Sequence, residues 1–148
     1  TWVSMVSEAP TIPALQARLY GEKLGDYQAV SGWWEARHGR PLPEVLLPPI
    51  GVIVEGDGVP VAALWCYQSV GIGVCFLEFL CTPPQLCPRS ARKAIKMAVD
   101  ACVMIAKAQG DYSYFRCIAE PLLAREVAKL GFAVEAEGFT QLAFRQDG

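Results

Sequence analysis

The chain has 148 residues, of which 53% are hydrophobic and 19% are charged, and its formal net charge at pH 7 is −2. This length is typical of one domain and the composition is that of a globular protein. We therefore expect a single domain over residues 1–148 and exclude a disordered chain. The slightly negative charge also excludes an overall electrostatic attraction to nucleic acid.

One stretch of the sequence is long enough to suggest a membrane span. No charged residue lies between Asp57 and Glu78, and a run of about 20 apolar residues can cross a bilayer. However, Pro60 and Gly73 would interrupt a helix in this stretch, which instead predicts two buried strands joined by a turn. We therefore expect no membrane partner.

The first residues and the cysteines indicate a cytoplasmic protein. No basic segment followed by an apolar one is visible at the start, so we expect no signal peptide. The six cysteines show no CxxC spacing and are few for a disulfide scaffold, so we expect reduced and mostly buried thiols. His38 is the single histidine, and we expect it to be exposed and to hold no metal.

The first half of the chain predicts two short helices followed by strands. Leu15 and Leu19 fall on one face of a helix over residues 12–24. Asp26 is placed to cap the next helix, and the Gly-Asp-Gly sequence at 56–58 is typical of a hairpin turn. In chain order we expect a strand at 1–7, helices at 12–24 and 27–38, and strands at 50–55, 59–68 and 74–81.

The second half predicts a strand–helix–strand crossover. Apolar residues from Ala91 to Ile105 recur at helical spacing, and Gly110 is typical of the end of that helix. Strands joined through such a helix are parallel neighbours or splay apart. The expected elements are a helix at 90–109, a strand at 112–119, a helix at 121–130 and an antiparallel pair of strands at 133–137 and 139–145.

The order β-α-α-β-β-β-α-β-α-β-β predicts an α+β fold with a mixed, mainly antiparallel sheet. Three local sequences add to this: Gly-Asp-Gly-Val-Pro-Val-Ala-Ala at 56–63, Phe-Leu-Cys-Thr-Pro at 79–83 and Ala-Lys-Leu-Gly-Phe at 128–132. They are similar to a hairpin, to the exit of the cofactor-binding strand and to the end of the last helix in the GNAT superfamily of acyl-CoA-dependent N-acetyltransferases. The resemblance covers nearly the whole chain and implies a GNAT-like sheet with helices on both faces.

The resemblance implies that acetyl-CoA is the co-substrate. The pyrophosphate loop of the family has two glycines, where this sequence has Pro88 and Ser90. Because Pro88 removes a backbone donor, an ordinary helix start with a solvated basic face remains the alternative. The residues that the resemblance implies for cofactor binding are Leu80, Cys81, Thr82, Gln85, Arg89, Ser90 and Ala91.

Two residues are candidates for catalysis. Glu78 is the only charge in its strand, and a partly buried carboxylate with a raised pKa suits the removal of a proton from an amine. A structural ion pair with Arg116 is the alternative for this residue. Val127 stands where the family often has the tyrosine that protonates the leaving CoA thiolate, so the thiolate would leave unassisted, take its proton from water or use a nearby tyrosine such as Tyr114.

The leading hypothesis is transfer of an acetyl group from acetyl-CoA to a small-molecule or peptide amine by direct attack. Trp33 and Trp34 would line the acceptor site, with simple helix packing as the alternative. A non-catalytic GNAT-fold module that binds CoA weakly, or only a protein partner, is the second hypothesis. A cysteine acyltransferase using Cys81 or Cys117 is a third, although no histidine supports it. The stretch at 33–43 is also loosely similar to phage or prophage proteins, and the oligomeric state stays open.

Overall fold

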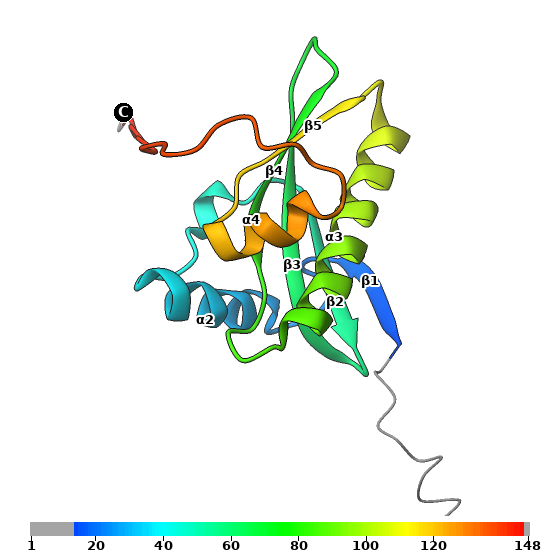
Figure 1. Ribbon diagram of the computed structural model, residues 1–148, viewed down its shortest axis with the longest axis vertical. Helices are drawn as coiled ribbons and strands as arrows, with labels where there is room; N and C mark the ends of the chain where they lie inside the picture. Colours follow the sequence, from blue (N-terminus) through cyan, green and yellow to red (C-terminus); the bar gives the residue numbers. More distant parts are fainter. Residues whose placement is uncertain (1–13, 147–148) are drawn as a thin grey trace, which may run out of the picture.

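Five strands form one sheet with helices on both faces in the computed structural model, which describes residues 14–146 (Figure 1). The strands follow one another across the sheet in chain order. The neighbours from β1 to β4 are antiparallel, and β4 and β5 are parallel. The predicted α+β class and mixed, mainly antiparallel sheet are confirmed. The elements are β1 (Leu15–Leu19), α2 (Asp26–His38), the 3-10 helix η1 (Glu44–Leu46), β2 (Ile50–Gly56), β3 (Val59–Gln68), β4 (Val74–Cys81), α3 (Pro88–Gln109), β5 (Tyr114–Cys117) and α4 (Pro121–Ala128).

The helices cover the two faces of the sheet with separate hydrophobic clusters. α3 and α4 lie on one face (Figure 1), where Ile95, Ala98 and Cys102 of the predicted apolar stripe are fully buried. On the other face, Val30 of α2 belongs to a cluster with Trp65 of β3. The predicted placement of helices on both faces is therefore confirmed. No helix within residues 14–146 is both long enough and apolar enough to cross a membrane.

Residues 15–19 form a strand, so the helix predicted at 12–24 is wrong there. That prediction depended on Leu15 and Leu19, which lie one helical turn apart, but Leu19 is exposed. The segment instead pairs antiparallel with β2 along its whole length. Pairing with a neighbouring strand outweighs the weak helical preference of so short a segment. The strand predicted at 1–7 lies outside the described residues.

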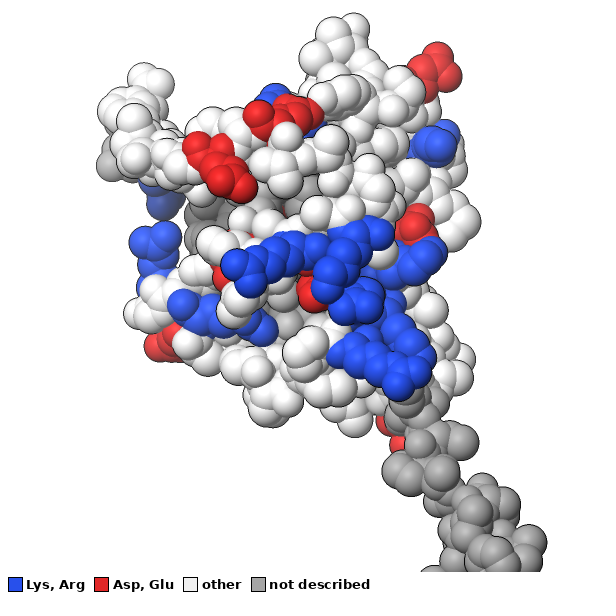
Figure 2. Space-filling model, in the orientation of Figure 1, with Lys and Arg blue, Asp and Glu red and all other residues white. Residues whose placement is uncertain are grey.

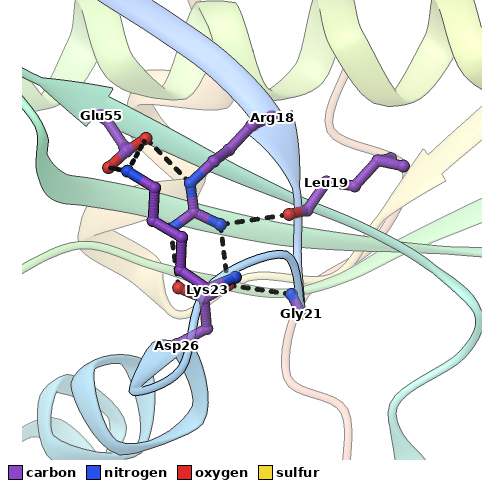
Figure 3. Close-up of polar contacts among 6 residues, drawn as sticks. All are labelled: Arg18, Leu19, Gly21, Lys23, Asp26 and Glu55. Atoms are coloured by element: carbon purple, nitrogen blue, oxygen red, sulfur yellow. Dashed lines mark hydrogen bonds and ion pairs between the residues drawn. The ribbon is translucent and has the colours of Figure 1, made fainter.

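A group of charged side chains joins β1, β2 and the start of α2 (Figure 3). Arg18 donates to both carboxylate oxygens of Asp26 at 2.7 Å and to Glu55 at 2.8 Å, and Lys23 lies 2.9 Å from Glu55. Asp26 also accepts from the backbone N–H of Gly21 at 2.9 Å, and its side chain does not cap α2 as predicted, because the N-cap is a glycine. These bonds fasten α2 to one edge of the sheet.

Several boundaries in the second half differ from the prediction. α3 begins at Pro88, two residues earlier than expected, and β5 has four residues. The strands predicted at 133–137 and 139–145 are wrong for this structure, since residues 133–146 have no regular secondary structure. An alternating sequence forms a strand only where a partner edge receives it, and here the segment pairs with no strand of the described chain.

Candidate active site

β4 and β5 run side by side and then part, as predicted. Their ladder ends where Leu77 faces Cys117, and the last bond runs from the N–H of Ile118 to the carbonyl of Leu77 at 3.1 Å. β4 continues to Cys81 while the chain after β5 turns into α4. The two strands therefore open at their carboxyl ends, and the backbone of β4 beyond Leu77 has no partner strand on that side within residues 14–146.

A β-bulge deforms β4 at this opening. Trp65 of β3 faces Glu78 and Ala63 faces Cys81, so β4 uses one residue more than β3 over the same length. Phe79 has a φ of 61°, a left-handed conformation that non-glycine residues rarely adopt and that costs on the order of 1–3 kcal/mol. A bulge leaves backbone groups unpaired and redirects side chains, and bulges are frequent beside active sites.

Glu78 lies on β4, directly before Phe79. It is half-buried, and burial raises the pKa of its carboxyl. The alternative ion pair with Arg116 is not formed: the Arg116 guanidinium lies 3.3 Å from Glu135 instead. No hydrogen bond or ion pair reaches Glu78 from the part of the chain that the structure describes. The charge of Glu78 adds to burial in raising the pKa of the Cys117 thiol, which places the carboxylate close to the strand opening.

The second half of α2 lies against the bulge and the end of β4. The rings of Trp34 and Phe79 meet edge to face with centroids 5.4 Å apart. Arg37 follows Trp34 by three residues and so shares its helix face. It donates to the hydroxyl of Thr82 at 3.0 Å and lies 3.7 Å from the carboxylate of Glu120. α2 thereby connects the end of β4 with the start of α4, across the strand opening.

The start of α3 offers backbone donors. Cys87 is the N-cap of α3, and Pro88 occupies the first helical position. The N–H at that position has no acceptor inside any helix, so the missing N–H of Pro88 costs the helix little. The N–H of Ala91 donates to the carbonyl of Cys87 at 2.9 Å, so this predicted contact to the cofactor is already taken. The N–H groups of Arg89 and Ser90 find no backbone acceptor within residues 14–146.

Basic side chains gather on the same face as α3 and α4. Figure 2 shows Lys and Arg in a band across this face, although the net charge of the chain is −2. Such a local field favours an anionic ligand even on a protein that is negative overall. The exposed basic residues of the first half of α3, of α4 and of the C-cap of α4 are Arg89, Arg92, Lys93, Lys96, Arg125 and Lys129.

Known structures share this architecture. A Trypanosoma brucei acetyltransferase matches 88% of this chain and 100% of its own at 16% identity, with a TM-score of 0.59. An aminoglycoside N-acetyltransferase in complex with CoA matches 94% and 98% at 17% identity, with a TM-score of 0.58. The chain has the GNAT acetyltransferase fold. The same fold occurs in a transcriptional regulator from Bacillus halodurans, matched over 88% and 100% at 14% identity with a TM-score of 0.63.

The GNAT fold alone does not define the reaction of this chain. No family model and no curated protein matches its sequence, and unrelated functions recur on one fold. The chemistry must therefore be argued from the side chains around the strand opening.

Within this GNAT fold, the side chains at the end of β4 are buried. Leu80, Cys81 and Thr82 are each less than 5% exposed, and the carbonyl of Thr82 already accepts from Arg37 at 3.3 Å. Burial raises the pKa of the Cys81 thiol to about 12 and that of Cys117 to about 11. Thiols with such values are poor nucleophiles, which argues against the cysteine acyltransferase hypothesis. Gln85 is exposed in the loop before α3.

The tyrosine predicted as the acid lies away from the opening. Tyr114 is the first residue of β5, about 10 Å along the strand from Cys117 at 3.3 Å per residue. Its hydroxyl donates to Glu135, and this bond raises the pKa of Tyr114. Tyr67 lies closer to Glu78: burial first, and then the Glu78 charge, raise the pKa of the Tyr67 hydroxyl.

Both tryptophans predicted for the acceptor site pack against the hydrophobic cluster beneath α2, and Trp34 also contacts Phe79. Two residues at this position, Arg37 and Phe79, were not predicted from the sequence. Arg37 could have been found from its spacing, because it lies one helical turn after Trp34. The left-handed conformation of Phe79 has no signal in the sequence, since a glycine would be expected at such a position.

Other features of the described chain are weaker candidates for the active site than the strand opening. A surface hollow of about 380 Å³ lies at the turn between β3 and β4, lined by residues 69–73 and 110–112, at the opposite end of β4 from the bulge. Within residues 14–146, no group of three or more His, Cys, Asp or Glu side chains is arranged to hold a metal ion. All six cysteines are free thiols, and His38 is exposed as expected.

Proposed function

We propose that the chain is an acyl-CoA-dependent N-acetyltransferase acting on the amine of a small molecule or a peptide. One observation carries the proposal: Glu78, half-buried and without a partner among the described residues, lies beside a strained bulge where two parallel strands part. Similarity in fold to acetyltransferases, one of them in complex with CoA, supports it.

The open edge of β4 and the start of α3 would hold acetyl-CoA. The unpaired backbone of β4 beyond Leu77 suits the amides of an extended pantetheine arm, as in the addition of a strand to a sheet edge. The N–H groups of Arg89 and Ser90, at the positive end of the α3 dipole, suit its phosphates. The bound molecule would supply an activated thioester carbonyl.

Glu78 would remove the proton from the acceptor amine. Burial raises the pKa of Glu78, so its carboxylate accepts a proton more readily than an exposed one. The neutral amine nitrogen then bonds to the acetyl carbon and gives up a second proton to water, while the carbon–sulfur bond breaks and its electron pair leaves with sulfur. Val127 is apolar and 3% exposed, so the thiolate takes its proton from water; a thiol pKa near 8.5 makes this leaving group acceptable.

The face of α2 that meets the bulge would bind the acceptor. Trp34 and Phe79 present aromatic surface next to Glu78, and Arg37 holds this part of α2 to Thr82 at the end of β4. An aromatic surface beside a carboxylate suits an amine that arrives as a cation.

The test is thiol release from acetyl-CoA across a panel of small amines and peptide N-termini, with the acetylated product identified by mass spectrometry. Glu78→Gln is expected to lower amine-stimulated release by about 10²–10⁴-fold, the usual contribution of a positioned base. Glu35→Gln, at an exposed position of α2, is the matched control and should retain full activity.

Two results would overturn parts of the proposal. If no amine stimulates release while calorimetry shows bound CoA, the chain is a CoA-binding module without catalysis. If release survives Glu78→Gln, the reaction stands but Glu78 is not its base. Activity should also fall as the pH drops through the pKa of Glu78, which lies above the usual value of 4.5.

A further inference from the structure

The side of the sheet that faces α2 is open along β5. Successive side chains of a strand point to opposite faces of its sheet. Phe115 and Cys117 pack against the cluster beneath α3, whereas the other side chains of this stretch are exposed on the opposite face, namely Tyr114, Arg116 and Ile118. A ligand can therefore reach this face of β5.

Glu78 lies on the same open face, next to β5. Phe76 and Glu78 of β4 are half-buried, while Leu77 between them is fully buried beneath α3. Phe76 faces Arg116 in the parallel ladder, and the guanidinium carbon of Arg116 lies 5.7 Å from the centre of the Phe76 ring. This contact is a cation–π interaction, which holds the Arg116 side chain over β4. The register and the ring contact both place Arg116 on the face that carries Glu78.

Glu78 and Arg116 have opposite charges but are offset from each other along the strands. Glu78 follows Phe76 by two residues, which is about 6.6 Å along β4 at 3.3 Å per residue. A ligand whose ammonium and carboxylate groups are a few bonds apart fits this offset. Its ammonium group would bond to Glu78 and its carboxylate to Arg116, at about 2.9 Å in each case.

Glu135 already places a carboxylate on this arginine. Its carboxylate lies 3.3 Å from the Arg116 guanidinium and also accepts from the Tyr114 hydroxyl. The side chains of Glu135 and Arg116 are each 48% exposed, and an ion pair so exposed contributes little to stability. Arg116 belongs to a strand, whereas Glu135 lies in a segment without regular secondary structure. The arginine is therefore the fixed member of the pair, and another carboxylate can replace that of Glu135.

Given the acetyl transfer proposed above, on which this inference rests, we propose that Arg116 selects an acceptor with a carboxylate close to its amine, that is, a free amino acid. The carboxylate of the acceptor takes the place of Glu135 on Arg116, and its amine faces Glu78. A diamine has no carboxylate, and a peptide carries its carboxylate far from its terminal amine. Neither class meets both side chains, so both are poorer acceptors.

The first test compares L-amino acids with their carboxamides, by kcat/KM for thiol release from acetyl-CoA. An amino acid is expected to exceed its carboxamide by about tenfold or more, which is the usual effect of a hydrogen bond between charged groups. Arg116→Gln should abolish this preference by raising the KM for the amino acid, while the carboxamide is unaffected. Lys107→Gln removes an exposed cation near the far end of α3 and should leave the preference unchanged.

The second test makes the opposite change. Glu135→Gln removes the carboxylate that competes for Arg116, so the KM for the amino acid should fall while that for the carboxamide stays the same. A KM for the amino acid that does not fall contradicts the exchange of carboxylates on Arg116.

Failure of the Arg116 role and failure of acetyl transfer give different results. If carboxamides or diamines are acetylated as well as amino acids, acetyl transfer stands and the role of Arg116 is overturned. If no amine stimulates thiol release, titration calorimetry with the same amino acids in the presence of CoA decides. Binding that Arg116→Gln weakens by about tenfold or more supports the carboxylate site. Binding that this variant leaves unchanged, or no binding to the parent chain, overturns it.

Discussion

Two carboxylates at opposite ends of the sheet differ in their bonding partners. At the β1–β2 end, Asp26 is 4% exposed and is bonded by Arg18 and a backbone N–H. At the β4–β5 end, Glu78 is half-buried and has no bonded partner in the described chain. The hydrogen bonds from Arg18 hold the pKa of Asp26 below its usual value, while burial alone raises the pKa of Glu78.

This difference separates stability from reactivity. A carboxylate whose charge is fully bonded lowers the free energy of the fold and has little remaining capacity to react. A carboxylate kept half-buried without a partner, beside a strained bulge, destabilises the fold and is ready to accept a proton.

The largest effect is expected for Asp26→Ala. It removes the bidentate partner of Arg18, which keeps only Glu55 as a charged partner, and leaves the N–H of Gly21 without its acceptor, so the free energy of unfolding should fall by about 2 kcal/mol. Urea denaturation at neutral pH measures this. The control is Asp100→Ala, which removes an exposed ion pair with Lys96 and should cost less than about 0.5 kcal/mol. Equal losses of unfolding free energy in the two variants would contradict the stabilising role of the bonds between Asp26 and Arg18.

Arg89→Glu should weaken CoA binding more than tenfold, about 1.4 kcal/mol, because attraction to the phosphates becomes repulsion at the start of α3. Titration calorimetry measures the dissociation constant. Lys107→Glu makes the same charge change near the other end of α3 and should leave the affinity nearly unchanged. If both variants bind equally, the start of α3 is not the phosphate site.

Glu78→Gln should raise the free energy of unfolding by on the order of 0.5–1 kcal/mol at neutral pH, although it removes activity. The folded pKa of Glu78 is raised, so stability is lost as the pH rises from the unfolded value, near 4.3, through the folded one. Glutamine has no charge to bury and avoids this loss. The gain should vanish near pH 3, where Glu78 is protonated in both states. A less stable variant at pH 7 would show that Glu78 has a structural partner.

The smallest effect on the protein is expected in a thiol-labelling experiment, because modification of a surface thiol leaves the fold intact. Cys87 is exposed, and its bond to the Ser90 hydroxyl, with nearby N–H groups, lowers the pKa of its thiol. Burial raises the pKa of the Cys66 and Cys102 thiols. One thiol should therefore react rapidly in the native protein and all six after unfolding. Cys87→Ser should abolish the rapid phase. In the unchanged protein, CoA should slow this phase if its phosphates bind at the start of α3.

Part of the fold and of the candidate site was predictable from local patterns. The stripe around Ile95 and Ala98 predicted α3, the Gly-Asp-Gly turn predicted the β2–β3 hairpin, and Glu78 stood out as the single charge of its strand. β1 was not predictable, because its five residues become a strand only by pairing with β2. The strands predicted at 133–137 and 139–145 failed for the same reason, since strand pairing depends on a distant edge.

What the sequence by itself determined is therefore local: the amphipathic helices, the turns, the apolar strands and the isolated charge of Glu78. Hydrophobic periodicity acts over a few residues and needs no knowledge of neighbours. Only the tertiary structure decided that Glu78 has no bonded partner within residues 14–146, that Phe79 adopts a left-handed conformation in the bulge, and that Arg37 reaches Thr82. These features depend on contacts between residues far apart in the chain, and no local pattern encodes which distant groups will meet.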